Sequence, residues 1–246
     1  MNEEGTYRIY DLQGEYQQHS LGSDASETGV LDVRIHENGL VALTGSLALL
    51  EVKGFDGARP VTLSSPGRFT VVVVVTYADE SIQGLNEPPQ AWAVIPPDLT
   101  VSRHTEVLIS PVSSPSILSV DSLETVDQRL ARGPFTHISP SPNGRSLALM
   151  TFSGTLWVVS TDFQRSLAEY DTTQKAAEGA EGPIRQVEWC GNDAVLVTWQ
   201  NLALLVGPFG DTLRYGIHSS SQLHSFFSQL RFFLQSVSIT LVLLTP

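Results

Sequence analysis

The chain has 246 residues and a mass of 26.8 kDa, which is long enough to bury a sizeable core in one large domain or two smaller ones. Hydrophobic residues make up 41% of the chain and charged residues 16%, and there are 19 glycines and 14 prolines, a composition that favours many short strands joined by turns. The formal net charge of −12 argues against a basic surface that binds nucleic acid.

Cysteine usage and the N-terminus both favour the cytosolic side of a membrane. Cys190 is the single cysteine, and no Asn-x-Ser/Thr glycosylation acceptor occurs in the chain. Residues 1–4 are followed by no apolar run of signal-peptide length. We therefore expect neither a disulfide framework nor a secretory leader.

The first predicted strands form a hairpin and the start of a repeated unit. Residues 7–10 and 16–21 flank a turn, and they are typical of the outer strands of a sheet whose inner strands are not encoded here. Three strands of a second unit are predicted at residues 30–35, 40–44 and 47–52. Asn38–Gly39 and Gly45–Ser46 separate these strands, and Gly and Asn accept the left-handed backbone angles that such turns need.

The middle of the chain predicts another unit with long loops. Val71–Val75 is a β-branched run within a strand predicted over residues 69–77. Further strands of this unit are expected at residues 92–95, 106–109 and 116–120. The stretches 79–90 and 110–115, rich in Pro, Ser and acids, are the expected loops.

Two segments in the second half of the chain, residues 135–171 and 184–216, share one layout of strands and turns. Ile138 and Val187 occupy equivalent positions, 49 residues apart. A period of about 40–50 residues with four strands per unit is typical of a β-propeller blade, because one such sheet cannot bury both faces alone. The sequence therefore predicts an all-β fold over residues 1–216: an incomplete β-propeller of about four four-stranded antiparallel blades plus a partial one.

Residues 217–246 do not fit the pattern of the blades. They carry one charged residue, Arg231, and all 26 acidic residues precede them. Polar residues interrupt the apolar stretch 226–244, and its most apolar part, 237–244, is too short to span about 30 Å of hydrocarbon. We expect a non-propeller tail, helical or disordered, and no membrane span.

Several strings in the chain resemble one known family. They are Ile9–Tyr16, Val30–Ile35 with Val41–Gly45, and Gln186–Cys190 with Ala194–Trp199 and Leu204–Gly207. In order and spacing they are similar to the N-terminal β-propeller of the vacuolar protein sorting sixteen family, a class C core subunit of the HOPS and CORVET tethering complexes. The resemblance covers residues 7–215 and implies a seven-bladed propeller followed by an α-helical solenoid, in a scaffold without catalysis of its own.

The same resemblance implies partners and a location. The partners are other subunits of HOPS and CORVET, in intracellular protein transport and vesicle tethering, and the location is cytoplasmic, peripheral to endosome and vacuole or lysosome membranes. The family's first blades and its solenoid have no counterpart in this sequence, so we interpret the chain as a truncated fragment. Because the solenoid holds the Sec1/Munc18-like subunit in the family, binding of that subunit is not expected here.

Sequence motifs for catalysis and metal binding are missing. There is no G-x-S-x-G, H-E-x-x-H, G-x-x-x-x-G-K-[ST] or C-x-x-C pattern. Asp11–Gly14 matches a D-x-x-G loop in letters but, without a P-loop, predicts a β-turn. The six histidines are scattered: His19, His36, His104, His137, His218 and His224. We expect no enzyme, no cofactor and no metal site, and we interpret Cys190 as a small buried hydrophobic residue.

Tryptophans give the one candidate for partner recognition. Trp157, Trp189 and Trp199 fall at predicted strand positions, where core packing is expected. Trp92 lies among prolines, in loop-like surroundings, and is a candidate anchor for a protein partner, with a packing contact under a long loop as the alternative.

Two functions stay open from the sequence. One is a scaffold domain of an endolysosomal membrane-tethering complex. The other is a generic peptide-binding propeller of the WD40 or Kelch kind, and the lack of Gly-His and Trp-Asp pairs argues against it.

Overall fold

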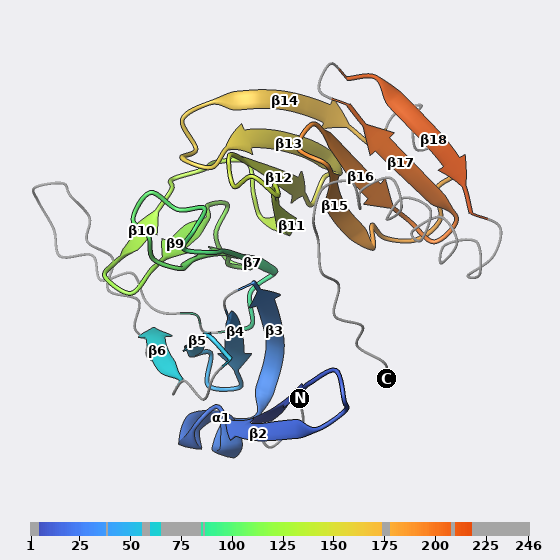
Figure 1. Ribbon diagram of the computed structural model, residues 1–246. Coiled ribbons are helices and arrows are strands. Elements are labelled where there is room, and N and C mark those ends of the chain that lie inside the picture. The colour runs from blue at the N-terminus through green and yellow to red at the C-terminus, as the bar shows by residue number, and fades with distance from the viewer. Residues whose placement is uncertain are drawn as a thin grey trace, which may run out of the picture. The chain divides into compact units, whose positions relative to one another are not determined.

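The computed structural model describes residues 5–37, 39–55, 60–64, 85, 87–173, 178–207 and 210–217. The chain forms two compact units, Met1–Thr136 and His137–Pro246. Strands dominate both units (Figure 1).

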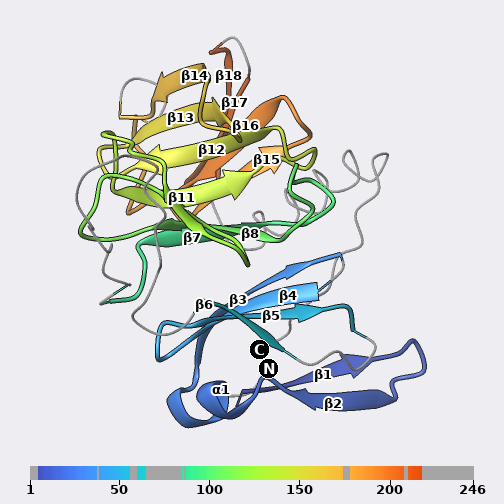
Figure 2. The same ribbon diagram turned by 90° about the vertical axis from the view of Figure 1, so that its left-hand side faces the viewer.

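The first unit begins with a hairpin and continues into two four-stranded sheets. The hairpin consists of β1 (Thr6–Tyr10) and β2 (Tyr16–Ser20), and the short helix α1 (Ser23–Thr28) follows it. The first blade comprises β3 (Val30–His36), β4 (Gly39–Thr44), β5 (Leu49–Lys53) and β6 (Val61–Ser64). The second blade comprises β7 (Ala91–Ile95), β8 (Glu106–Ser110), β9 (Leu118–Val120) and β10 (Thr125–Asp127). Figure 2 shows the hairpin and α1 beside β3, β4 and β5.

The second unit holds two further sheets of the same kind. The third blade comprises β11 (Phe135–Pro140), which starts at the border of the units, β12 (Ser146–Thr151), β13 (Thr155–Ser160) and β14 (Ser166–Asp171). The fourth blade comprises β15 (Gln186–Cys190), β16 (Ala194–Thr198), β17 (Leu202–Val206) and β18 (Thr212–Gly216). In every blade, strands that follow each other in the chain are neighbours in the sheet. The predicted all-β class with four-stranded antiparallel blades is confirmed.

Turn chemistry explains why the strands reverse where they do. In the β1–β2 turn, one carboxylate oxygen of Asp11 accepts hydrogen bonds from the backbone N–H groups of Gln13 (2.9 Å) and Glu15 (2.8 Å). Gly14 has a φ of 87° there, and Gly154 has a φ of 88° between β12 and β13, angles that other residues adopt only with strain. The β-turn predicted at Asp11–Gly14 is confirmed.

Strand β4 shows how stacked sheets bury both faces of a blade. Leu40 and Ala42 pack toward Tyr7 and Leu21 of the hairpin region. Val41 and Leu43, on the opposite face, pack with residues of the second blade. Successive side chains of a strand point to opposite faces, so a strand between two cores is an uninterrupted apolar run, as β4 is.

The structure contains elements that were not predicted, and one strand starts later than predicted. Helix α1 and strands β6 and β10 were not predicted, and β10 supplies the fourth strand of the second blade. The predicted strand at residues 69–77 and most of the predicted loop at 79–90 lie outside the described residues. Strand β5 starts at Leu49 instead of residue 47, because Leu47 has a φ of 66° and belongs to the preceding turn.

Ile217 is the last described residue and the first of the predicted tail. Its backbone N–H donates to the carbonyl oxygen of Asn201 (2.7 Å), and its side chain is 5% exposed and packs with Leu196 and Ala203 of the fourth blade. Residues 218–246 lie outside the described residues. The boundary between residues 216 and 217 stays a prediction.

Candidate functional site

Trp92, the residue singled out in the sequence, lies in β7 with its side chain in a core. It is 6% exposed and packs in a cluster with Val41 and Leu43 of the first blade and Val107 of the second. Its indole Nε1 donates a hydrogen bond to Oδ2 of Asp32 in β3 (3.0 Å). Trp92 therefore connects the first and second blades by packing and by a hydrogen bond.

Arg34 completes this connection at the surface. One guanidinium nitrogen lies 3.2 Å from Oδ2 of Asp32, and the guanidinium carbon lies 5.3 Å from the ring centroid of Trp92. Both Asp32 and Arg34 are about half exposed, so water screens their ion pair and makes it weak. The indole of Trp92 beneath them is buried. This burial favours the packing role of Trp92 over a role as an exposed anchor, and partner recognition by Trp92 stays a prediction.

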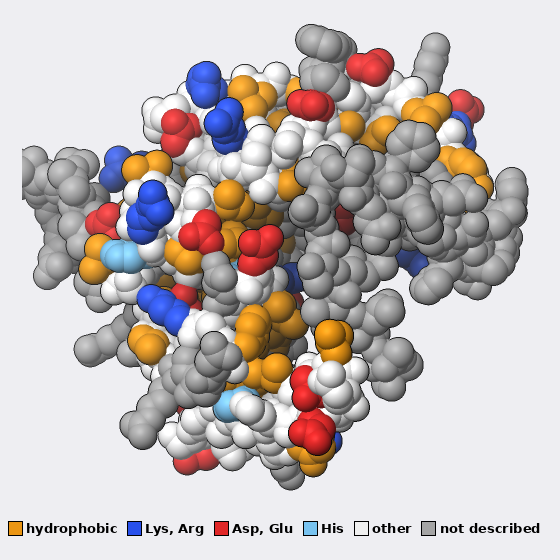
Figure 3. Space-filling view, in the orientation of Figure 1, with side chains coloured by type: hydrophobic (Ala, Val, Ile, Leu, Met, Phe, Trp, Pro, Cys, Tyr) orange, Lys and Arg blue, Asp and Glu red, His pale blue; other side chains and the backbone are white. Residues whose placement is uncertain are grey.

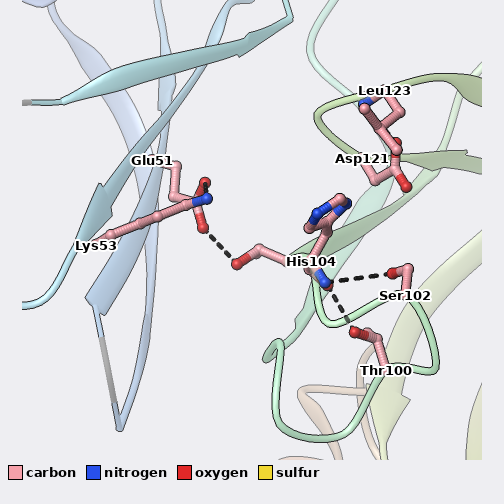
Figure 4. A network of polar contacts seen from close by, with 8 residues as sticks. Glu51, Lys53, Thr100, Ser102, His104, Asp121 and Leu123 are labelled. Atoms are coloured by element: carbon pink, nitrogen blue, oxygen red, sulfur yellow. Dashed lines mark hydrogen bonds and ion pairs between the residues drawn. The ribbon is translucent and has the colours of Figure 1, made fainter.

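A second polar cluster lies between the same two blades, around Glu51 of β5 (Figure 4). Glu51 is 1% exposed. Its Oε1 accepts a hydrogen bond from the hydroxyl of Thr105, the residue before β8, and its Oε2 lies 3.4 Å from Nζ of Lys53. Since an unpaired buried carboxylate is strongly destabilising, these two contacts offset the cost of burying Glu51.

Two histidines flank this cluster. Burial lowers the pKa of His36, and the carboxylates of Glu51 and Asp98 act in the opposite direction. Neither ring nitrogen of His36 has a hydrogen-bond partner among the described residues. The loop carrying His104 is held through its backbone: the N–H donates to Ser102 Oγ (3.3 Å), and the carbonyl accepts from Thr100 Oγ1 (2.7 Å).

One further carboxylate, Glu106 at the start of β8, has an altered pKa. Burial raises the pKa of Glu106, the hydrogen bond that the Ser119 hydroxyl donates to it acts against this, and the nearby Asp121 raises it further. Burial also raises the pKa of the Cys190 thiol, which keeps it in the unreactive protonated form.

The histidines and carboxylates of the described residues do not assemble into a metal site. Within the described ranges, no three His, Cys, Asp or Glu side chains form a group that could hold a metal ion. In the same residues, no helix is long and apolar enough to cross a membrane. On the face seen in Figure 3, the described Lys and Arg side chains lie interspersed with Asp and Glu.

Two of the other three tryptophans pack in a core as predicted, although Trp199 directly follows β16; Trp157 is only partly buried and is not part of the core between the third and fourth blades. Trp199, 6% exposed, belongs to the core between the third and fourth blades, and Trp189 packs against that core. Trp189 Nε1 also donates to the carbonyl oxygen of Ser139 (2.8 Å). Trp157 in β13 donates from Nε1 to Ser166 Oγ (2.8 Å).

Sequence reasoning missed the partners of Trp92 and the buried Glu51. Asp32 and Trp92 are 60 residues apart, and no local pattern links them. One feature of the sequence could have indicated the buried Glu51: it is an acidic residue within the otherwise apolar run Leu47–Val52. Both faces of this strand are buried.

Comparison with known proteins decides the family. The family model described as "Vps16, N-terminal region" matches residues 1–241. The chain belongs to the Vps16 N-terminal family. The resemblance seen in the sequence strings is thereby confirmed.

Curated Vps16 relatives cover most of the chain. A probable vacuolar protein sorting-associated protein 16 homolog of Schizosaccharomyces pombe is 30% identical over 217 residues, which are 87% of this chain and 24% of that protein. Protein VACUOLELESS1 of Arabidopsis thaliana is 26% identical over 231 residues, covering 87% of this chain and 25% of that protein. The chain thus spans about a quarter of the length of these relatives.

Solved structures agree on the propeller fold. The β-propeller domain of Cps50 (Swd1) from Myceliophteria thermophila has a TM-score of 0.56 at 12% identity, covering 86% of this chain and 67% of that one. Sqt1 of Saccharomyces cerevisiae has a TM-score of 0.51 at 14% identity, covering 86% of this chain and 56% of that one. At these identities the likeness concerns the fold alone, and the four sheets are blades of a β-propeller.

Proposed function

We propose that this Vps16 family member is a non-catalytic scaffold in an endolysosomal membrane-tethering complex. The family match over residues 1–241 carries the proposal. Relatives that share this region are vacuolar protein sorting proteins by name, in Schizosaccharomyces pombe and Dictyostelium discoideum among others.

The chemistry of the described residues supports a scaffold role. Two polar contacts of the described residues, Asp32 with Trp92 and Glu51 with Thr105, join neighbouring blades. Propeller blades present strand edges and loops on which other proteins can dock. Groups used to fix one blade against the next are not available to bind and convert a substrate.

The proposed partners are other subunits of HOPS and CORVET, and the proposed location is peripheral to endosome and vacuole membranes. Attachment would occur through those subunits. Binding of the Sec1/Munc18-like subunit is not proposed for this region, because the resemblance assigns that contact to a helical solenoid.

The proposal is tested by tagging the protein at its own locus and purifying it from those cells under mild detergent. The expected result is stoichiometric co-purification of the other tethering subunits, and fragmented vacuoles with stalled endosome fusion when the gene is deleted. Purification without any of those subunits, or normal vacuole morphology and cargo sorting in the deletion strain, would contradict the proposal and favour a generic peptide-binding propeller.

A further inference from the structure

A groove in the second unit lies between the third and fourth blades. Its walls are apolar residues of β13 and β14, among them Val158, Leu167 and Tyr170, and residues of the fourth blade, among them Trp189 and Val195. Its volume is about 230 Å³, below the roughly 300–1,000 Å³ typical of small-molecule sites. A groove of this size suits one or two inserted side chains.

A β-bulge in β14 brings an additional apolar side chain to the groove. Val158 pairs with Ala168 but Val159 pairs with Ser166, so Leu167 is the extra residue in the register. In a regular strand the side chains of Leu167 and Ala168 would point to opposite faces. Instead both line the groove, and bulges next to binding sites often re-aim a side chain in this way.

Two hydrogen bonds connect the blades that form the groove. Trp189 Nε1 donates to the carbonyl oxygen of Ser139 (2.8 Å). The backbone N–H of Asn143 donates to Oδ1 of Asn192 (3.1 Å). Both bonds run from the third blade to the fourth, so a ligand would meet preformed walls, which lowers the entropic cost of binding.

The charge at the groove specifies its occupant. Among the described residues, Asp193 is the one charged residue that lines the groove, and it is exposed and forms no ion pair with any of them. Leu167 is 48% exposed, so a ligand that covers its side chain removes apolar surface from water, which favours binding. A ligand complementary to both residues carries an aliphatic side chain next to a basic one.

We propose that this groove binds an extended peptide segment of a partner protein, with an aliphatic side chain inserted beside Leu167 and a Lys or Arg paired with Asp193. Strand β14 lies at the edge of its sheet, where its one sheet neighbour among the described residues is β13. The other edge of β14 can pair with such a segment. The site is a property of the purified chain and does not depend on the proposed tethering role.

The test is a selection of random dodecapeptides displayed on phage, carried out with the full chain of 246 residues and counter-selected with Leu167→Glu. Enriched peptides are expected to share an aliphatic residue within three positions of a Lys or Arg. A synthetic peptide of the enriched sequence should bind at least tenfold more weakly to Leu167→Glu and to Asp193→Lys, measured by fluorescence anisotropy.

Leu213→Glu is the matched control, since Leu213 is also a leucine of an outer strand, is 69% exposed and does not line the groove. It should bind the peptide as the natural chain does, and thermal melts should show all three variants folded. No enrichment over Leu167→Glu, enrichment of acidic peptides, or equal loss of binding in Leu213→Glu would overturn the proposal. So would binding that occurs only after residues 218–246 are deleted, because the chain's own tail would then be the occupant. None of these results would bear on the tethering proposal, whose test is co-purification.

Discussion

Replacing Trp92 tests the claim that packing at this residue, more than its hydrogen bond, joins the first two blades. A tryptophan buries roughly 150–250 Å², which at about 25 cal/mol per Å² corresponds to about 4–6 kcal/mol as an upper bound. With Trp92 only 6% exposed, Trp92→Ala should cost about 4 kcal/mol of unfolding free energy, in line with other large-to-small core changes.

The hydrogen bond from Trp92 to Asp32 is expected to contribute less. Asp32 is about half exposed, so its carboxylate regains water when the indole is lost, and a bond to a charged group is worth about 1.5 kcal/mol net. Trp92→Phe removes the donor and keeps an aromatic ring, and it should cost about 2 kcal/mol. Asp32→Ala should cost about 1 kcal/mol.

Urea denaturation followed by far-UV circular dichroism measures these free energies. Phe152→Ala is the control, because Phe152 is 79% exposed and its replacement should change stability by less than about 0.5 kcal/mol. If Trp92→Phe were as costly as Trp92→Ala, the hydrogen bond would dominate the connection. If Trp92→Ala cost less than about 1 kcal/mol, Trp92 would not be a core residue.

Three further predictions concern titration and the tail. Burial raises the pKa of Glu106 in the folded protein above its usual 4.5. The contribution of Glu106 to stability is therefore fully present below pH 4.5 and is lost as pH rises through the raised pKa. Glu106→Gln should stabilise the protein at about pH 7 in urea melts, with no gain at about pH 4. Burial lowers the pKa of His36 in the folded protein below 6.5. The contribution of His36 to stability is therefore present above pH 6.5 and is lost as pH falls through the lowered pKa. His36→Leu should reduce the loss of stability at acidic pH, and an unchanged dependence of stability on pH would contradict this prediction. Deleting residues 218–246 should change stability by less than about 0.5 kcal/mol, whereas Ile217→Ala should cost about 2 kcal/mol; a loss above about 2 kcal/mol on deletion would show that the tail belongs to the fold.

The blades of the second unit were predictable because their local signals agree. In residues 135–171 and 184–216, apolar runs of strand length are bounded by turns that contain Gly or Asn, and the same order recurs at a fixed offset.

The missed elements lack such signals. Strand β10 is three residues long, Thr125–Asp127, and only Thr125 in it is buried. Helix α1 is six residues long and buries Ala25 alone, so it has no apolar face to detect. Both elements form because neighbouring strands position them, which is a tertiary effect.

The contacts between blades could not be predicted from one sequence. Pairing within a sheet follows from turns, but the hydrogen bond of Trp92 to Asp32 depends on how two sheets stack. The bulge at Leu167 depends on a one-residue shift in pairing that no turn or apolar pattern encodes. Features that come from stacking and irregular pairing therefore appeared only with the structure.

A chimaera in Schizosaccharomyces pombe tests the central claim of a Vps16 function most directly. The region of the fission-yeast relative that aligns with this chain, 217 residues at 30% identity, is replaced at its own locus by the corresponding residues of this protein. If this chain has a Vps16 function, the strain should show normal vacuole morphology and cargo sorting, and the other tethering subunits should be recovered in purification. Fragmented vacuoles in a strain whose chimaera is expressed at the natural level would contradict it.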